Sequence, residues 1–471
     1  MIQTFFRRIT TWKANIGWFV AAIIFLVYVP MMLYLLNFPS VFPVYGDGLY
    51  YVTLAGNILH HGVFSGSVQA PFVPATFIMP AYPLFLAIFI GTFGSYTLFP
   101  LVQLVLAGAT SFLIFKIGER VFSYSAGVIA ALLFILDPTT IFHSLIIMTD
   151  IPYVFLLVLS VYLLFFDAEG TEEGAPVRTF FAGIFFGVAM LTRVISMFLP
   201  IVIIPLYFLI KNNRISTKKI IINLFILTIA YSAVVVPWVA RNNAVSGVWG
   251  IANEKSLNVF QYYVPEFLSY TRGISADEGR NILMEELRRD VGVSSSETID
   301  IGSLEYAPAE EKIAFRYIRE DFWGYAKFHL IKMVPFFLSS QIKNSLIFYN
   351  NALGYEAYKI NGGNMTNLLA GARFKEFWSE LQIQPVVTLE QLFWLLISSL
   401  AFVGAVFSGR KYHVYAILFV VLIFYFAVLT GPLAYSRFRL PSAPFLFLLA
   451  AYGTSVVARV ARNVFTKEKV I

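Results

Sequence analysis

The chain has 471 residues, of which 58% are hydrophobic and only 13% are charged, and its mean hydropathy is +0.74. This composition excludes a soluble globular domain and indicates an integral membrane protein. The net charge of +7 favours membrane topology over nucleic-acid binding, because Lys and Arg stand at the ends of apolar runs. The sequence contains no cysteine, which excludes disulfides, a thiol nucleophile and cysteine-ligated metal sites.

The first apolar run, residues 16–36, is long enough for a helix that crosses the bilayer, which takes about 20 residues. The basic segment FFRRITTWK before it favours an N-terminus on the cytoplasmic side. A secretory signal would have a shorter apolar stretch and a small-residue cleavage site, so we expect a retained helix. Asp47 then emerges on the outer face.

An amphipathic helix is predicted directly after Asp47, in the segment GLYYVTLAGNILHHG at residues 48–62. Its apolar side chains share one face, so we expect the helix to lie in the membrane interface. Asp47 serves this helix as N-cap, as a catalytic base, or as both. The two roles are compatible, because a carboxylate held at a helix start is both positioned and kept ionised.

Ten further apolar runs bring the expected number of transmembrane helices to about eleven, within a range of 10 to 13. They cover residues 97–117, 124–142, 151–166, 179–193, 196–210, 219–238, 324–345, 389–407, 412–430 and 439–459. The apolar segment 80–94 is too short to cross at about 1.5 Å per residue, and we expect it to be interfacial or re-entrant.

The threading of the chain depends on segment 80–94. If this segment stays at the surface, the basic residues of 116–123 face the cytoplasm, and Asp150 emerges on the same outer face as Asp47. The basic segment 211–219 is then also cytoplasmic. The C-terminus is in conflict: eleven crossings place it outside, whereas its Arg and Lys residues favour the cytoplasmic side.

Three parts of the chain follow from this reading. Residues 1–239 form a transmembrane module whose first outer loop, 37–96, is catalytic. Residues 240–388 form an extracytoplasmic region of helices and loops that includes one transmembrane helix at 324–345. Residues 389–471 form the C-terminal transmembrane helices. The fold class is therefore an all-α polytopic membrane protein with interfacial helices and a small extracytoplasmic helical region.

Asp150 interrupts a long apolar tract, where a charge at the bilayer centre would cost about 2.5–3.5 kcal/mol. We therefore expect it at the membrane boundary, at the start of a helix that Thr149 or Asp150 caps and Pro152 supports. A simple cap explains this position by itself. The catalytic interpretation is favoured because Asp47 and Asp150 reach the same outer face from separate loops.

Several arginines are candidates for binding a phosphate, because guanidinium groups form bidentate bonds that ammonium groups cannot. Arg193 lies between two short apolar runs, Arg241 follows Trp238, and Arg437 and Arg439 precede the last apolar run. The alternative is that Arg193 and Arg241 only anchor their helices at the membrane interface.

His61 and Tyr82, both in the first outer loop, complete the set of candidate substrate-binding residues. His60 and His61 are also explained as favourable charges at a helix C-terminus. The sequence has no nucleotide-binding glycine motif, no H-E-x-x-H and no G-x-S-x-G elbow. No metal ligands are assigned, although a divalent metal shared by Asp47 and Asp150 stays open.

The order of several motifs resembles the class C membrane glycosyltransferases, and most closely glycosyltransferase family 39. The motifs are GDGLYY, MPAYPLFLAIFIGTFG, KIGERVFS, LDPTTIFHSLIIMTDIPY, LTRV, PWVARNNAVSG and SRFRLPSAP. The family includes protein mannosyltransferases and is related to the aminoarabinose transferase of lipid A. The resemblance covers residues 17–250 well and the region from 389 loosely. This chain departs from the family by lacking a Lys-Pro-Pro run in the first outer loop, which leaves donor-phosphate contacts to the arginines.

The resemblance implies an enzyme that takes a sugar from a polyprenyl-phosphate carrier and transfers it outside the cytoplasm. The family's acidic positions match Asp47 and Asp150. We expect Asp47 to deprotonate an acceptor hydroxyl of a lipid, glycan or protein, Asp150 to orient the acceptor or share this role, and the anomeric centre to be inverted. The expected location is a bacterial or archaeal cell membrane, with the lipid bilayer and the lipid-linked sugar as partners and no nucleic acid.

Two other functions remain open at this stage. A flippase or transporter of lipid-linked saccharides would also place basic residues at membrane depth, but it would need charges along a mid-membrane pathway. A polysaccharide polymerase or ligase would concentrate its working residues in one large outer loop, whereas the candidates here are spread over several.

Overall fold

The computed structural model describes residues 16–37, 42–44, 46–166, 175–212, 215–294, 297–345 and 385–467. Most of the basic N-terminal segment, most of the acidic segment 167–178 and most of the polar stretch 348–388 lie outside the described residues. The described part of the chain is helical throughout, with turns and loops but no β-strand. The predicted all-α polytopic fold is confirmed.

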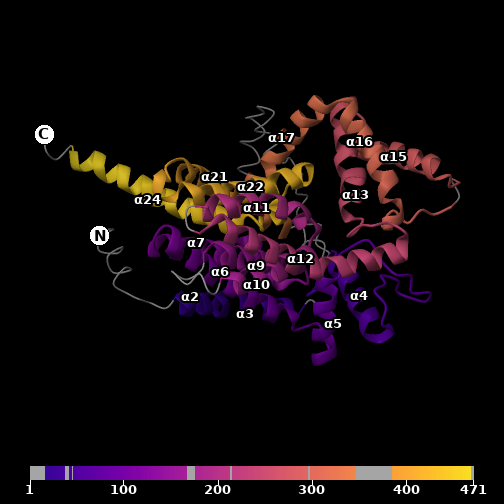
Figure 1. The fold of residues 1–471 in the computed structure, drawn as a ribbon, viewed down its shortest axis with the longest axis horizontal. Coiled ribbons are helices and arrows are strands. Elements are labelled where there is room, and N and C mark those ends of the chain that lie inside the picture. Colours follow the sequence, from indigo (N-terminus) through magenta and orange to yellow (C-terminus); the bar gives the residue numbers. More distant parts are fainter. Residues whose placement is uncertain are drawn as a thin grey trace.

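A bundle of long apolar helices forms the body of the protein (Figure 1). Its members are α2 (Ile16–Ile23), η1 (Ile24–Tyr28), α3 (Val29–Leu35), α6 (Phe99–Val121), α7 (Tyr124–Leu136), α8 (Pro138–Leu145), α9 (Asp150–Phe165), α10 (Ala175–Met190), α11 (Leu199–Lys211), α12 (Thr217–Ser246), α21 (Pro385–Val406), α22 (Gly409–Thr430) and α24 (Ala443–Lys467). The short elements η3 (Val194–Phe198), η6 (Gly431–Leu433) and α23 (Ser436–Arg439) connect them.

The remaining helices gather at one end of the bundle, on the right in Figure 1. They are α4 (Gly48–His61), α5 (Ala81–Phe93), α13 (Glu254–Asn258), η4 (Val259–Tyr263), α14 (Val264–Arg272), α15 (Ala276–Val291), η5 (Leu304–Tyr306), α16 (Ala307–Glu320) and α17 (Phe322–Leu338). We call residues 254–320 the polar lobe and this end of the bundle the lobe end. Helices α15 and α16 lie in residues 240–388, for which the sequence predicts a region of helices and loops.

Seven helices of the described chain are long and apolar enough to cross a membrane, or eight if α7 and α8 count as one span bent by 52°. All eleven predicted runs are helical, but four of them do not form a single helix that is long enough to cross a membrane. Helix α7 breaks at Asp137 and Pro138, α9 and α10 have 16 residues each, and α17 has 17 residues. The predicted count of about eleven therefore exceeds the number of helices that are long enough.

Helix α17 lies within the segment 324–345, which the sequence predicts to cross the membrane. The ring of His329 contacts the carbonyl of Val428 near the end of α22, at 2.8 Å, and Arg439 of α23 donates to the carbonyl of Phe336 at 3.1 Å. Helix α17 thus packs against the end of α22 and against α23. With 17 residues, it is shorter than the seven helices that are long enough to span a membrane, and it carries lysines at 327 and 332.

The described ends of the chain lie close to each other along the bundle axis. The start of α2 and the end of α24 are both at the end of the bundle opposite the lobe, on the left in Figure 1.

Helix α5 is a short helix of 13 residues at the lobe end, as the length of its apolar run predicts. The backbone N–H of Ala81 donates to the carbonyl of Leu191, which follows α10, at 2.9 Å. Helix α5 ends at Gly94, which has a positive φ of 73°. Segment 80–94 therefore enters and leaves at one end of the bundle, and the starts of α4 and α9 are brought to that same end.

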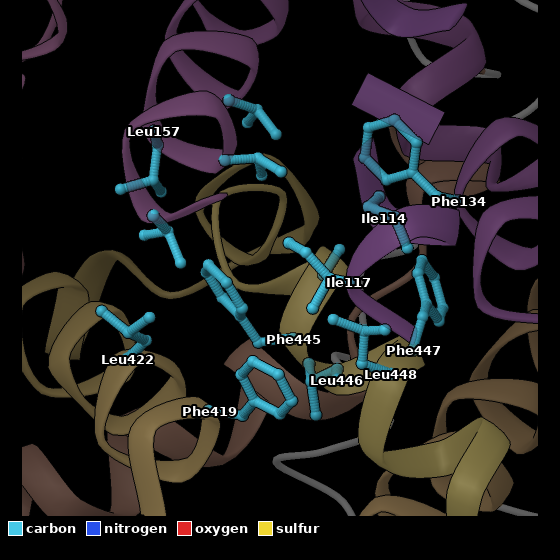
Figure 2. Close-up of a cluster of buried hydrophobic side chains, with 14 of the residues drawn as sticks. Ile114, Ile117, Phe134, Leu157, Phe419, Leu422, Phe445, Leu446, Phe447 and Leu448 are labelled. Carbon is cyan, nitrogen blue, oxygen red and sulfur yellow. The ribbon is translucent and has the colours of Figure 1, made fainter. Parts of the chain in front are cut away.

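The main core lies between the central helices. Figure 2 shows Ile114 and Ile117 of α6, Phe134 of α7, Leu157 of α9 and Phe419 of α22 converging with side chains of α24. In a membrane, lipid tails are as apolar as Leu, so close packing rather than exclusion of water stabilises such contacts.

Glycines allow the closest helix pairs to form. A Cβ on Gly118 of α6 would lie 2.5 Å from the Cα of Gly127 on α7. Between α21 and α24, a Cβ on Gly404 would lie 2.1 Å from the carbonyl oxygen of Leu449, and one on Gly453 would lie 2.0 Å from that of Leu400. These helices approach so closely because small residues stand at their crossings.

Candidate active site

Asp47 stands at the start of α4, directly after Gly46, whose φ is +54°. Its position is that of an N-cap, but its carboxylate accepts no hydrogen bond from the helix backbone. Instead, its Oδ2 accepts a hydrogen bond from Nη1 of Arg437 at 3.0 Å. The Asp47 side chain is 57% exposed, so the carboxylate is both fixed by a cation and accessible.

Asp150 is the first residue of α9, and its side chain is fully buried. The preceding residue, Thr149, makes no side-chain cap. The Asp150 carboxylate accepts hydrogen bonds from Nε of Arg437, at 3.3 Å for Oδ1 and 3.1 Å for Oδ2. It also pairs with Nη1 of Arg193. Arg437 therefore bridges the two aspartates.

Backbone packing holds the starts of α4 and α9 together. The N–H of Ile147, in the extended segment before Asp150, donates to the carbonyl of Pro43 at 2.8 Å. Gly48, the first residue of α4, lies so close to this segment that a Cβ would be 2.8 Å from the carbonyl oxygen of Ile147. The glycine after Asp47 thus allows the first outer loop to reach the loop that carries Asp150.

The two paired arginines come from the ends of other helices. Arg193 follows α10 in an extended conformation, with φ at −144°, and only 10% of its side chain is exposed. Its guanidinium lies 5.9 Å from the ring centres of Tyr153 and Phe438. Arg437 lies in α23, after the turn at Gly431 that ends α22. Burial, charge pairing and ring contacts therefore hold both guanidinium groups in place.

The ion pairs dominate the electrostatics of Arg437. Burial favours the neutral form and would lower its pKa, but the negative charges of Asp150 and Asp47 outweigh burial and raise it. Arg437 consequently remains a cation at every pH relevant to the protein. Two carboxylates and two guanidinium groups balance one another in this cluster, which we call the Asp–Arg cluster (Asp47, Asp150, Arg193 and Arg437).

Glu254 is a further acid of this site that the sequence analysis missed. It is the first residue of α13, and its carboxylate interacts electrostatically with Arg193, Arg437, Asp47 and Asp150. Burial raises its pKa, the two arginines oppose that rise, and the two aspartates add to it. The available sequence signal was an acidic residue at a helix start shortly after a span, in the segment GIANEKS.

The other candidate residues of the first outer loop lie elsewhere. Tyr82 is buried beneath the site, with its ring 5.1 Å from that of Tyr51 and its hydroxyl donating to Gln103 at 3.1 Å. His61 is in the last turn of α4, exposed, and stacked on Phe72 with the ring centres 4.2 Å apart. Neither residue makes a direct contact with the Asp–Arg cluster that the structure records.

Arg241 supports the first outer loop. It lies near the end of α12, donates to the carbonyl of Ala75 at 2.7 Å, and stands 4.8 Å from the ring centre of Trp238. Arg439 is almost fully buried, 3.5 Å from the ring centre of Trp394, and donates to the carbonyls of Phe336 and Ser339. Of the candidate arginines, the structure therefore brings Arg193 and Arg437 to the aspartates, and it holds Arg241 and Arg439 in other contacts.

The fit of a metal ion can be judged from the donor set. Across the described ranges, no group of three or more His, Asp or Glu side chains is arranged to hold one. Both aspartates already have guanidinium partners at hydrogen-bond distance. The side chains of the described ranges therefore do not form a metal site.

Residues 74–239 match the family model described as dolichyl-phosphate-mannose-protein mannosyltransferase. The resemblance to glycosyltransferase family 39 is confirmed. This family-39 segment runs from the end of the first outer loop to the outer part of α12, and it contains Asp150 and Arg193. Asp47, Glu254 and Arg437 lie outside it. No curated protein sequence is significantly similar to the chain.

Solved structures with a similar architecture include the oligosaccharyltransferase of Archaeoglobus fulgidus in its apo form. That structure is 14% identical with a TM-score of 0.52, over 98% of this chain and 52% of that chain. AglB from the same organism, in complex with an inhibitory peptide and a dolichol-phosphate, is 13% identical with a TM-score of 0.48, over 91% of this chain and 48% of that chain. At these identities the likeness concerns the fold alone, and this chain spans about half the length of these chains.

ArnT from Cupriavidus metallidurans, bound to undecaprenyl phosphate, is also similar. It is 12% identical with a TM-score of 0.42, over 95% of this chain and 79% of that chain. The comparison with the oligosaccharyltransferase thus supports a class C membrane fold, and residues 74–239 resemble the mannosyltransferase family.

Proposed function

We propose that the protein is a glycosyltransferase that moves a sugar from a polyprenyl-phosphate-linked donor to an acceptor hydroxyl at the extracytoplasmic face of the membrane. The observation that carries this proposal is the Asp–Arg cluster, in which Arg437 joins an exposed carboxylate to a buried one. The family-39 segment supports a dolichyl- or other polyprenyl-phosphate donor. The acceptor is a lipid, a glycan or a protein.

Asp47 is the general base of this reaction. Its carboxylate is accessible, so an acceptor hydroxyl can reach it, and the pairing with Arg437 keeps it oriented. A base must lie within about 3 Å of the proton that it removes, and general-base catalysis contributes about 10²–10⁴-fold to a rate. Asp47 takes the proton of the acceptor hydroxyl as its oxygen attacks the anomeric carbon.

Asp150 has a different role, because its carboxylate is enclosed and already accepts hydrogen bonds from Arg193 and Arg437. It positions these guanidinium groups, which stabilise the charge that develops on the departing phosphate. The enclosed carboxylate is not available as a nucleophile. A single displacement follows, with inversion of the anomeric centre, and phosphate leaves without a general acid.

An apolar groove between α11 and α22 fits the polyprenyl tail. It has a volume of about 580 Å³ and is lined by side chains that include Phe198, Val202, Val421 and Leu429. The hydroxyl of Tyr425, which also lines the groove, donates to the carbonyl of Ile195, two residues after Arg193. This bond connects the groove to the segment that carries Arg193, which supports a tail site in the groove.

The substitution Asp47→Asn tests the function directly, with a purified protein in lipid nanodiscs and a radiolabelled polyprenyl-phosphate sugar. We expect transfer to fall by about 10²–10⁴-fold while binding of the lipid phosphate persists. Asp277→Asn is the matched control, since Asp277 is an exposed residue of α15 paired with Arg280. Full transfer by the Asp47→Asn protein, or movement of the intact lipid-linked sugar without transfer, would overturn the proposal.

A further inference from the structure

Glu254 is held in place by its backbone, while its carboxylate is left unpaired. The N–H of Glu254 donates to the carbonyl of Phe77 at 3.1 Å, and the N–H of Asn253 donates to that of Thr76 at 3.1 Å. The Asn253 side chain also donates to the carbonyl of Ile301 at 2.7 Å. The start of α13 is thus fastened both to the first outer loop and to the loop before α16.

The Glu254 carboxylate makes no hydrogen bond or ion pair within the part of the chain that the structure describes. Its surroundings are set by packing, because Ala252, two residues before Glu254, packs against Val194, the residue after Arg193. The charged groups within electrostatic reach of Glu254 are Arg193, Arg437, Asp47 and Asp150, together with Tyr51 of α4 and Tyr263 of η4. Glu254 is half-buried and its backbone is fastened, so it is an unpaired acid that borders the site.

Whether a phosphate can bind beside Glu254 depends on whether the Glu254 carboxyl group is ionised or protonated. The Asp–Arg cluster is already neutral, because its two carboxylates balance its two guanidinium groups. An ionised Glu254 beside an incoming phosphate would place two negative charges together, which is unfavourable at low dielectric. A protonated Glu254 reverses this effect, because a carboxylic acid offers one O–H donor to a phosphate oxygen.

We infer that Glu254 is a donor-binding residue, which in its neutral form donates a hydrogen bond from its carboxyl O–H to a phosphate oxygen of the lipid carrier. This inference rests on the proposed function for the nature of the ligand. Binding of the phosphate is then coupled to retention or uptake of one proton by Glu254. The raised pKa of Glu254 in the free protein is in the direction that this coupling needs.

Binding of a polyprenyl monophosphate to the full chain in detergent micelles tests this inference without any transfer step. Calorimetry compares the wild type with Glu254→Gln and Glu254→Ala from pH 5.5 to pH 8.5, and the corresponding polyprenol is the probe without phosphate. Glu254→Gln keeps a neutral hydrogen-bond donor that cannot ionise. The pH dependence of its binding therefore reports the titration of the phosphate itself. Glu285→Gln, an exposed glutamate of α15, is the matched control.

The wild type and Glu254→Gln should bind the polyprenyl phosphate equally at pH 5.5. At pH 8.5 the wild type should bind it about tenfold more weakly than Glu254→Gln, which corresponds to a rise of about one unit in the pKa of Glu254 on binding. Glu254→Ala should bind more weakly at pH 5.5. The inference would be overturned if the ratio of the wild-type affinity to the Glu254→Gln affinity stayed constant from pH 5.5 to pH 8.5, or if Glu254→Ala bound the phosphate as tightly as the wild type. Either result would leave the proposed function standing. If the wild type does not bind the phosphate more tightly than the polyprenol, both fail.

Discussion

Arg437 donates hydrogen bonds to Asp47 and to Asp150, which lie 390 and 287 residues before it in the chain. Its Nη1 reaches one carboxylate and its Nε the other, so one planar group fixes the separation of the two acids. A guanidinium can do this because its N–H donors point in several directions from a rigid plane.

Replacing Arg437 by Lys should therefore disable the site while keeping its charge. An ammonium group can pair with one aspartate but cannot bridge both in this geometry. The loss of a charged hydrogen bond costs about 1.5–3 kcal/mol, so we expect transfer to fall by about 10- to 150-fold. Transfer assays with a lipid-linked sugar measure this effect. Arg316→Lys in α16, at an exposed ion pair with Glu286, should retain activity. Equal rates for Arg437→Lys and the wild type would contradict the bridging role.

Asp150→Asn should destabilise the fold far more than Asp47→Asn. The Asp150 carboxylate is buried, and its loss removes the ion-pair partner of Arg193 and one of the two partners of Arg437, which costs about 3–5 kcal/mol. Asp47 is mostly exposed, so the loss of its ion pair should cost at most about 1 kcal/mol. Thermal unfolding of the purified variants in detergent compares the two. Similar shifts in Tm for both would show that Asp150 is not the enclosed partner.

Glu310 should make the polar lobe less stable as the pH rises. It is buried in α16, burial raises its pKa to about 7, and neither of its oxygens has a well-aligned hydrogen-bond partner among the described residues, although its side chain faces Asn253. The unfolded chain binds this proton with a pKa near 4.5. Stability is therefore highest below that pH and decreases as the pH rises through about 7.

The substitution Glu310→Gln tests this pH dependence. The variant should lose much of the decrease in Tm between pH 5.5 and pH 8.5, because its side chain cannot ionise. Hydrogen exchange of α16 gives the local readout for the lobe. Glu305→Gln, at an exposed position of η5, is the control and should keep the wild-type profile. A Glu310→Gln protein with the full wild-type pH dependence would exclude Glu310 as its cause.

Gly453→Ala should loosen the contact between α21 and α24. The added Cβ would lie 2.0 Å from the carbonyl oxygen of Leu400, so the helices must separate, at a cost of about 1–3 kcal/mol. Gly56→Ala in α4 is the control, because a Cβ there meets nothing within 4 Å and alanine favours the helix. Thermal unfolding should show a lower Tm for Gly453→Ala only. A neutral result at Gly453 would mean that these helices can separate without cost.

The sequence alone predicts the fold class and the side-by-side arrangement of Asp47 and Asp150, because apolar run lengths determine how the chain is threaded. It does not distinguish Arg437 from Arg439, which stand two positions apart in α23, between α22 and α24. One points to the aspartates and the other is enclosed beside Trp394, and this choice depends on helix rotation in the packed bundle.

Two further features could not be predicted from the sequence, because each depends on contacts between distant segments of the chain. The run containing α17 is apolar, but its contacts with Val428 and Arg439 join segments about 100 residues apart and leave no local signal in the sequence. Glu254 belongs to a polar stretch with many acids, and its position at a helix start is shared by Glu266 and Glu278, so that signal alone does not single it out. Its role depends on the fastening of α13 to the first outer loop, which is a contact between distant segments.

The long sequence separation within the Asp–Arg cluster has a consequence for biosynthesis. Asp47 leaves the ribosome early, whereas Arg437 is made only after most of the bundle has been inserted. Until α22, α23 and α24 are in place, Asp47 lacks its guanidinium partner. Under the proposed function, sugar transfer would therefore begin only once these last helices have been assembled.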